Sequence, residues 1–208
     1  MAFSLPERFF QWAYQERAEM VRRMAGGEQI APETIFLNFT RHCPTFVSQG
    51  PAGLNGAVKG VGFIPKAEYL AETTADYLEH IGRGYREGYS QDGLQLLVKH
   101  IWGAHCAERI DFSRLGSLEL AKRHSWTNYT ANPELTLCFF QPPAVSFEVR
   151  GRVEIQESGP YHTFINAQHD TYHRPAPEKW PSRPAYIIHV AEIWDNSASK
   201  EGFGTRLL

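Results

Sequence analysis

A short basic stretch in the second half of the chain carries residue types that could bind a phosphate group. Lys122 and Arg123 supply two cations, and Ser125 and Thr127 supply two hydroxyls. The stretch stands between a predicted strand and a predicted helical turn, where backbone N–H groups are free to face an anion. Cations, hydroxyls and N–H groups together suit a phosphate. The alternative is an ordinary solvated strand end that a Ser or Thr side chain caps.

Two histidines four residues apart form a second candidate site. His169 and His173 would share one face of a helix, the spacing at which two imidazoles can bind one metal ion. Asp170 stands where a zinc protease motif has Glu, and the spacing identifies no third ligand. We therefore expect two surface or interface histidines and no metal site.

A third candidate combines a thiol with nearby imidazoles. His105 precedes Cys106 directly, and His100 lies six residues before it. A neighbouring imidazole can activate a thiol nucleophile, but adjacent residues seldom face each other. The chain also lacks a phosphate-binding P-loop, a dinucleotide-binding glycine pattern and the nucleophile elbow of hydrolases. No motif therefore names a reaction, a substrate or a catalytic residue.

Two strand-like runs follow the basic stretch. From Val145 to Ile155 apolar and polar residues alternate without a break, which predicts a half-buried antiparallel strand. Leu135–Phe140 precedes it across the turn at Gln141-Pro142-Pro143. The two runs predict a hairpin, with the longer run as a central strand.

The remaining elements are predicted from similar signals. A capping box at Ser4 and Glu7 begins a helix that ends at Gly26-Gly27. Further strands are predicted at Thr34–Phe39, Thr45–Ser48, Ala57–Ile64, Ile110–Phe112, Ser117–Lys122 and Ala185–Trp194. Helical segments are predicted from Pro65 to Gly82, at Asn128–Asn132 and at Tyr161–His173, while 93–105 fits a strand or a helix.

These elements predict an α+β fold, mainly β with flanking helices. Strands cluster without regular alternation with helices, so a small antiparallel barrel of about six or seven strands is the simplest arrangement. We expect one domain over residues 1–208, with an N-terminal helix, a helical insertion around 65–109 and a short C-terminal tail.

Composition limits the partners and the compartment. The formal net charge of −2 provides no basic field to gather nucleic acid. Three widely spaced cysteines favour a reducing cytoplasm over a disulfide framework. No signal peptide and no apolar run of about 20 residues is found, so we expect a cytoplasmic protein without membrane contact.

The basic stretch and the hairpin together resemble the pyridoxamine 5′-phosphate oxidase-like, flavin-binding split-barrel superfamily. Its members commonly show a basic or hydroxyl-bearing segment, an Asn, an Asn-Pro pair, a strand and then a V-x-G-x-A/V strand. Here these positions are Asn128, Asn132-Pro133, Leu135–Phe140 and Val149-x-Gly151-x-Val153. Residues 65–109 depart from the pattern, because the family usually passes more directly between strands there.

The resemblance implies a small antiparallel split β-barrel that binds FMN and acts as an oxidoreductase on a small molecule. Lys122, Arg123, Ser125 and Thr127 would hold the FMN phosphate. The flavin ring would lie between the subunits of a homodimer, with Trp126 and Trp194 as neighbours. Two alternatives stay open: a haem-binding or haem-processing protein of the same fold, in which a histidine would be the axial ligand, and a non-catalytic ligand-binding or regulatory protein.

Overall fold

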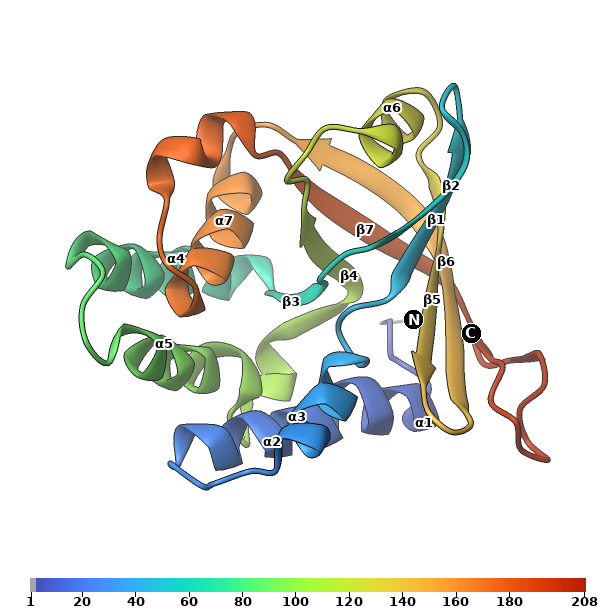
Figure 1. The fold of residues 1–208 in the computed structure, drawn as a ribbon, viewed down its shortest axis with the longest axis horizontal. Helices are drawn as coiled ribbons and strands as arrows, with labels where there is room; N and C mark the ends of the chain where they lie inside the picture. The colour runs from blue at the N-terminus through green and yellow to red at the C-terminus, as the bar shows by residue number, and fades with distance from the viewer. Residues whose placement is uncertain (1–2) are drawn as a thin grey trace.

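The computed structural model describes residues 3–208 and is built on one strongly curved antiparallel sheet (Figure 1). The strands are β1 (Thr45–Gly50), β2 (Gly53–Val58), β3 (Gly62–Pro65), β4 (Ile110–Leu118), β5 (Glu134–Gln141), β6 (Val145–Gln156), β7 (Ala185–Asp195) and β8 (Thr205–Arg206). They follow the order β2-β1-β5-β6-β7-β4-β3, with β8 paired to β7. Because β2 and β3 do not pair with each other within the described residues, the barrel is split.

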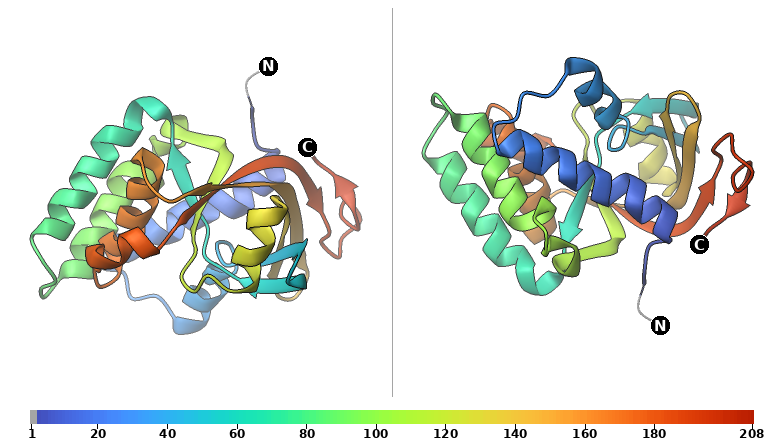
Figure 2. Two further views of the ribbon diagram at one scale, coloured as in Figure 1. Left: turned by 90° about the horizontal axis from the view of Figure 1, so that it is seen from above. Right: turned by 90° about the horizontal axis from the view of Figure 1, so that it is seen from below.

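Helices flank this sheet. They are α1 (Glu7–Phe10), η1 (Gln11–Gln15), α2 (Glu16–Ala25), α3 (Pro32–Phe39), α4 (Ala67–Gly82), α5 (Tyr89–Leu97), η2 (Val98–Trp102), η3 (Cys106–Arg109), α6 (His124–Ala131), α7 (Pro160–Tyr172) and η4 (Pro177–Ser182). Figure 2 shows α4, α5 and α7 gathered on one side of the barrel, while α6 stands alone beside the β1–β2 hairpin. The fold is therefore α+β, an antiparallel split barrel with flanking helices, as the sequence predicts.

The core lies where the inner face of the barrel meets the N-terminal helix. Phe147 and Val149 of β6 are each 1% exposed, and Phe139 of β5 is 2% exposed. Phe9 packs edge-on against Phe139 and Phe147, with ring centroids 5.9 and 5.2 Å away. Burial follows the predicted alternation along β6, so the central-strand prediction is confirmed. Burying such aromatic side chains contributes about 1.5–3 kcal/mol each.

Gly151, the glycine of the V-x-G-x-V pattern, is required at its position for a steric reason. The register between β6 and β7 shifts between Arg150 and Gly151, where the chain forms a bulge. A Cβ atom on Gly151 would lie 2.1 Å from the backbone oxygen of His189. Only glycine lets the two strands approach this closely.

Two N-terminal predictions are wrong. The segment predicted as a strand at Thr34–Phe39 is the helix α3, which has Pro32 in its first turn. Proline pre-sets the helical φ at that position, and this signal outweighs the β-branched and aromatic residues that follow. The predicted capping box is absent: the N-terminal helix begins at Glu7, with Pro6 as its N-cap and no side-chain cap.

Strand boundaries also differ from the predictions. The segment 57–64 is divided between β2 and β3, and β2 already begins at Gly53, so the β1–β2 turn is shorter than predicted. The two short strands predicted within 110–122 are the single strand β4, which ends at Leu118. The ambiguous segment 93–105 is helical as far as Trp102 and then turns. The predicted C-terminal tail contributes β8, so the sheet has eight strands and exceeds the predicted six or seven.

No helix within residues 3–208 combines the length and the apolar character that crossing a bilayer requires.

Candidate functional site

The basic stretch forms the turn between β4 and α6 at one end of the barrel (Figure 1). Lys122, Arg123 and Thr127 are exposed there. Lys122 adopts a left-handed backbone conformation with φ 48°, and its Nζ lies 4.9 Å from the centre of the Trp126 ring. Its ion pair with Glu157 is long, at 3.8 Å. Arg123 takes part in no ion pair within residues 3–208, so its charge is available to a ligand.

A buried carboxylate shapes this turn. Glu119 is 2% exposed, and its Oε1 accepts hydrogen bonds from the N–H groups of Ala121 (2.9 Å) and Lys122 (2.8 Å). Its Oε2 accepts from Lys59 Nζ at 2.9 Å and from the Tyr186 hydroxyl at 2.8 Å. These two backbone N–H groups therefore cannot face a ligand, contrary to the expectation for this part of the stretch.

The surroundings of Glu119 favour the ionised carboxylate. Burial raises the pKa of its carboxyl, but the hydrogen bonds from Lys59, Ala121 and Tyr186 outweigh that effect and leave the pKa below its ordinary value. Sequence reasoning missed this residue, although a lone acidic residue between Leu118 and Leu120 at a strand end was a visible signal.

Free backbone N–H donors lie in the residues that follow, at the start of α6. Thr127 N–H donates to the Arg123 carbonyl, 3.0 Å away, and begins the regular hydrogen bonding of α6. The N–H groups of His124, Ser125 and Trp126 have no partner within residues 3–208, and no side chain caps the helix. The start of α6 therefore offers three N–H donors beside the exposed Lys122 and Arg123.

The Ser125 side chain is turned toward the barrel. It is 5% exposed, and its Oγ accepts a hydrogen bond from Asn55 Nδ2 of β2 at 3.0 Å. Thr127, in contrast, is exposed. Of the two predicted hydroxyl ligands, Thr127 is the one whose side chain reaches solvent.

The two asparagines of the family-like pattern hold the β1–β2 hairpin against α6. Asn128 is fully buried and donates to Ser48 Oγ and the Gly53 carbonyl, while its Oδ1 accepts from Ala52 N–H. Asn132 donates to the Gln49 carbonyl at 3.0 Å. Their contacts position the start of α6 relative to the sheet, and this explains the asparagines without a ligand.

Trp126 and Trp194 lie far apart within one chain. Trp194 pairs with Glu148 in the β6–β7 ladder, whereas Lys122, which packs on Trp126, contacts Glu157 at the other end of β6. The two tryptophans therefore lie toward opposite ends of β6, separated by about 30 Å along the contour of the strand.

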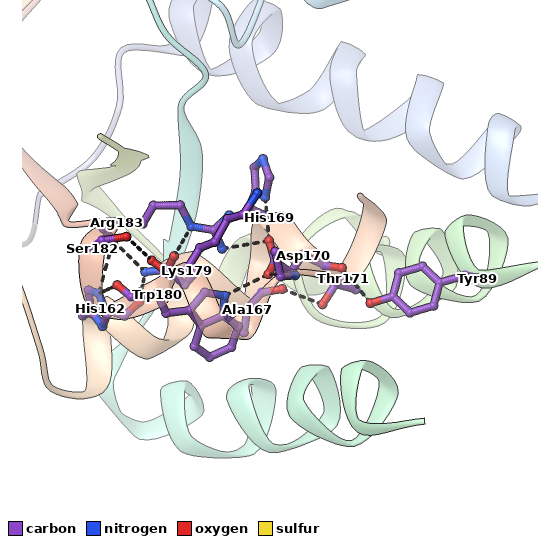
Figure 3. Close-up of polar contacts among 12 residues, drawn as sticks. Tyr89, His162, Ala167, His169, Asp170, Thr171, Lys179, Trp180, Ser182 and Arg183 are labelled. Atoms are coloured by element: carbon purple, nitrogen blue, oxygen red, sulfur yellow. Dashed lines mark hydrogen bonds and ion pairs between the residues drawn. The ribbon is translucent and has the colours of Figure 1, made fainter. Parts of the chain in front are cut away.

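His169 belongs to a buried polar network between α7 and η4. Figure 3 shows Asp170 at its centre, joined by dashed lines to His169, Trp180 and Arg183. Asp170 is fully buried, and its Oδ2 also accepts from the Ala176 N–H. Burial raises its pKa, but these donors, with His169 foremost, outweigh that effect and hold the pKa well below its usual range. The network fixes the proline-rich crossing onto α7.

His173 packs against His169, with ring centroids 4.6 Å apart. Among residues 3–208 no group of three His, Cys, Asp or Glu side chains is placed to hold a metal ion. The expectation of no metal site at these histidines stays a prediction.

His100 and Cys106 make separate contacts. The Cys106 thiol donates to the backbone oxygens of Val98 and Lys99. His100 is fully buried, and its Nε2 pairs with Asp76 Oδ2 at 2.7 Å. Neither group has the arrangement of a thiol activated by an imidazole.

Comparisons with known proteins concern the fold. No family model and no curated protein matches the chain. Solved structures do: HupZ from Group A Streptococcus is 14% identical, with 86% of this chain and 98% of that chain covered and a TM-score of 0.47. A Listeria innocua protein, provisionally described as a pyridoxamine 5′-phosphate oxidase, is 11% identical over 79% of this chain and 98% of that one, with a TM-score of 0.46.

An F420 reductase is 16% identical, with 73% of this chain and 88% of that chain covered and a TM-score of 0.37. Matches to pyridoxamine 5′-phosphate oxidase-like split-barrel proteins are thus found at low sequence identity. Likeness of this degree assigns no ligand and no reaction to the chain.

Proposed function

We propose that the chain binds FMN, with the phosphate at the start of α6, and that it serves as a flavin-dependent oxidoreductase for a small molecule. The observation that carries this proposal is the group of donors at one exposed point: Lys122, Arg123 and the N–H groups of residues 124–126. A dianionic phosphate needs both charge compensation and directed donors, and this point supplies both. Thr127 adds an exposed hydroxyl one turn into the helix.

The local residues also suit the part of FMN next to the phosphate. Trp126 is half-buried and offers an aromatic surface beside Lys122. Bound FMN would supply hydride or electron transfer, while the chain would bind, orient and shield it.

We also propose a homodimer formed through the outer face of β2, β1 and β5. The outward positions of these strands carry large apolar side chains, and no helix within residues 3–208 covers them. Leu54, Val58 and Phe140 are 76%, 69% and 57% exposed. Phe36 of the helix α3, which leads into β1, is also 69% exposed. Large exposed apolar side chains that share one sheet face are typical of interaction sites.

A second copy suits this face because the strands beside it carry paired charges of both signs. Arg152 pairs with Glu134, and Arg150 pairs with Glu148 and Glu192, so the neighbouring strands carry both signs. In an isologous interface the same surface of the two copies meets itself. A surface with charges of only one sign would therefore repel its copy. Trp12 and Trp102 are buried in the core, so Trp126, Trp180 and Trp194 are the tryptophans left for an interface.

The cofactor proposal is tested by the absorption spectrum of the purified protein, alone and after addition of FMN, riboflavin or haem. We expect the purified protein to show a flavin spectrum. If the protein is purified without its flavin, added FMN should restore that spectrum. A Soret band that saturates at one haem per chain would favour the haem alternative. A protein that stays colourless with each cofactor would favour the non-catalytic alternative.

The dimer proposal is tested by sedimentation at micromolar concentration. The wild-type chain should be a dimer, and Val58→Asp with Phe140→Asp should be a folded monomer, because two charges would be buried without partners. Leu78→Asp on α4 is a matched control, since Leu78 is exposed on another face of the molecule and should leave the dimer intact. A wild-type monomer would contradict the proposal.

A further inference from the structure

A small, partly open void lies between α2, the connection from α3 to β1, and β3. Its volume is about 20 Å³. Most of its wall is apolar and comes from the core, including Phe9, Phe63 and Phe139. Arg17, Arg41 and His42 are the polar exceptions. Three basic side chains around a small, largely apolar space are unusual, because burying charge without a partner is costly.

The same three side chains hold unpartnered polar atoms. Arg17 Nε, Arg41 Nε and His42 Nδ1 are buried, and none has a hydrogen-bond partner within the described part of the chain. Only four other side-chain atoms of residues 3–208 share this state, and they belong to residues that do not line the void. Buried polar groups are almost always paired, so this coincidence indicates a missing partner at one place.

The charge around the void is also unbalanced. The Arg41 side chain is 10% exposed and pairs with Glu16 through its Nη2, at 2.6 Å. Arg17 has no carboxylate partner within residues 3–208: its Nη1 contacts the amide and backbone oxygens of Asn38, and its guanidinium packs on Trp102. Two guanidinium groups thus face one carboxylate, which leaves one uncompensated positive charge.

Burial is the main influence on the ionisation of these side chains, and their mutual repulsion adds to it. Burial, together with repulsion from Arg41, lowers the pKa of Arg17 to about 10. Burial and the charge of Arg17 lower the pKa of His42 to about 3. An anion between these groups would oppose both shifts.

We propose that this void binds one small monovalent anion of halide size, held by the Nε–H groups of Arg17 and Arg41 and the ring of His42. The volume admits a single water-sized species, so larger anions such as phosphate do not fit. The anion supplies the missing negative charge and the missing hydrogen-bond acceptor. It joins α2 to the connection between α3 and β1, and β3 lines the same void.

The first experiment measures thermal unfolding of the full chain in sodium chloride and in sodium gluconate at equal ionic strength. Because chloride binds only the folded state, the melting temperature should rise by roughly 3–5 °C for each tenfold increase of chloride above its Kd. Gluconate is too large for the void and should give no such rise. Equal melting in both salts would mean that the void holds water, and would overturn the proposal.

Matched variants separate this site from general salt effects. Arg17→Met removes the unpaired charge at similar side-chain length, and it should abolish the chloride dependence. Arg23→Met is the control, since Arg23 lies on the exposed side of the same helix, paired with Glu28, and should keep the dependence. A chloride response that survives Arg17→Met would contradict the assignment.

If Arg17→Met does not fold, the bound anion can be located directly in crystals of the wild-type chain with bromide. Crystals grown in sodium bromide should show an anomalous peak within hydrogen-bond distance of Arg17 and Arg41. A void without such a peak, in crystals that contain bromide at other surface positions, would refute the site.

Discussion

Lys59 Nζ lies 2.9 Å from Glu119 Oε2, and this ion pair fixes the turn from which Lys122 and Arg123 project. The pair is enclosed, with the Lys59 and Glu119 side chains 15% and 2% exposed. Lys59 comes from the connection between β2 and β3, while Glu119 follows β4. The pair therefore joins the two sides of the split in the barrel at the base of the candidate site.

Glu119→Gln should destabilise the fold by about 3 kcal/mol, because it leaves Lys59 as a buried charge without its partner. Urea unfolding at pH 7 measures this loss. Glu157→Gln is the control, since Glu157 is exposed and its contact with Lys122 is long. A loss below about 1 kcal/mol would mean that the pair does not hold the turn.

The pH dependence of the same pair has a defined sign. The pKa of Glu119 is lowered in the folded chain, so its stabilisation is fully present above the unfolded value of about 4.3 and is lost as the pH falls through the folded value. The difference in stability between wild type and Glu119→Gln should therefore shrink in acid. A difference that stays constant from pH 7 to pH 3 would contradict the depressed pKa.

Val149→Asp should unfold the protein or make it insoluble, because Val149 is 1% exposed on the inner face of β6. The free-energy cost of burying an unpaired carboxylate exceeds the few kcal/mol by which such a domain is stable. Arg152→Ser on the outer face of the same strand is the control and should melt within a few degrees of the wild type. Thermal unfolding of both variants, followed by circular dichroism, tests this expectation.

Replacing His169 and His173 together by Ala should leave the metal content of the protein unchanged. The pair lacks a third ligand, and Asp170 keeps its bonds from Trp180 and Arg183 in the variant. Elemental analysis of protein purified without chelator measures this directly. Stoichiometric zinc in the wild type that the double variant loses would overturn the prediction.

The fold was largely predictable because its strongest sequence signals are local. The alternation of Val145–Ile155 was sufficient to predict β6 and its buried face. The strand prediction for Thr34–Phe39 failed because the β-branched and aromatic residues there favour a strand. Pro32, which favours the start of a helix, outweighs them. Propensity in so short a segment is easily overridden by its flanking residues.

The site was less predictable because it depends on contacts between distant residues. Lys122 and Arg123 were recognised from their types, and they are exposed at the start of α6. The neighbours of Glu119 on β7 and beyond β2 could not be inferred, since they are 67 and 60 residues away in the chain. For the same reason sequence spacing gave no sign that Arg17 and Arg41 line one void.

The central claim, that the start of α6 holds the phosphate of FMN, is tested most directly by fluorescence titration of wild type and Arg123→Ala with FMN and with riboflavin. A charge-assisted contact contributes about 1.5–3 kcal/mol, so the substitution should weaken FMN roughly ten- to a hundred-fold. Riboflavin lacks the phosphate and should bind the wild type poorly, with nearly the same Kd for Arg123→Ala. Equal weakening of both flavins, or no binding of either to the wild type, would contradict the account.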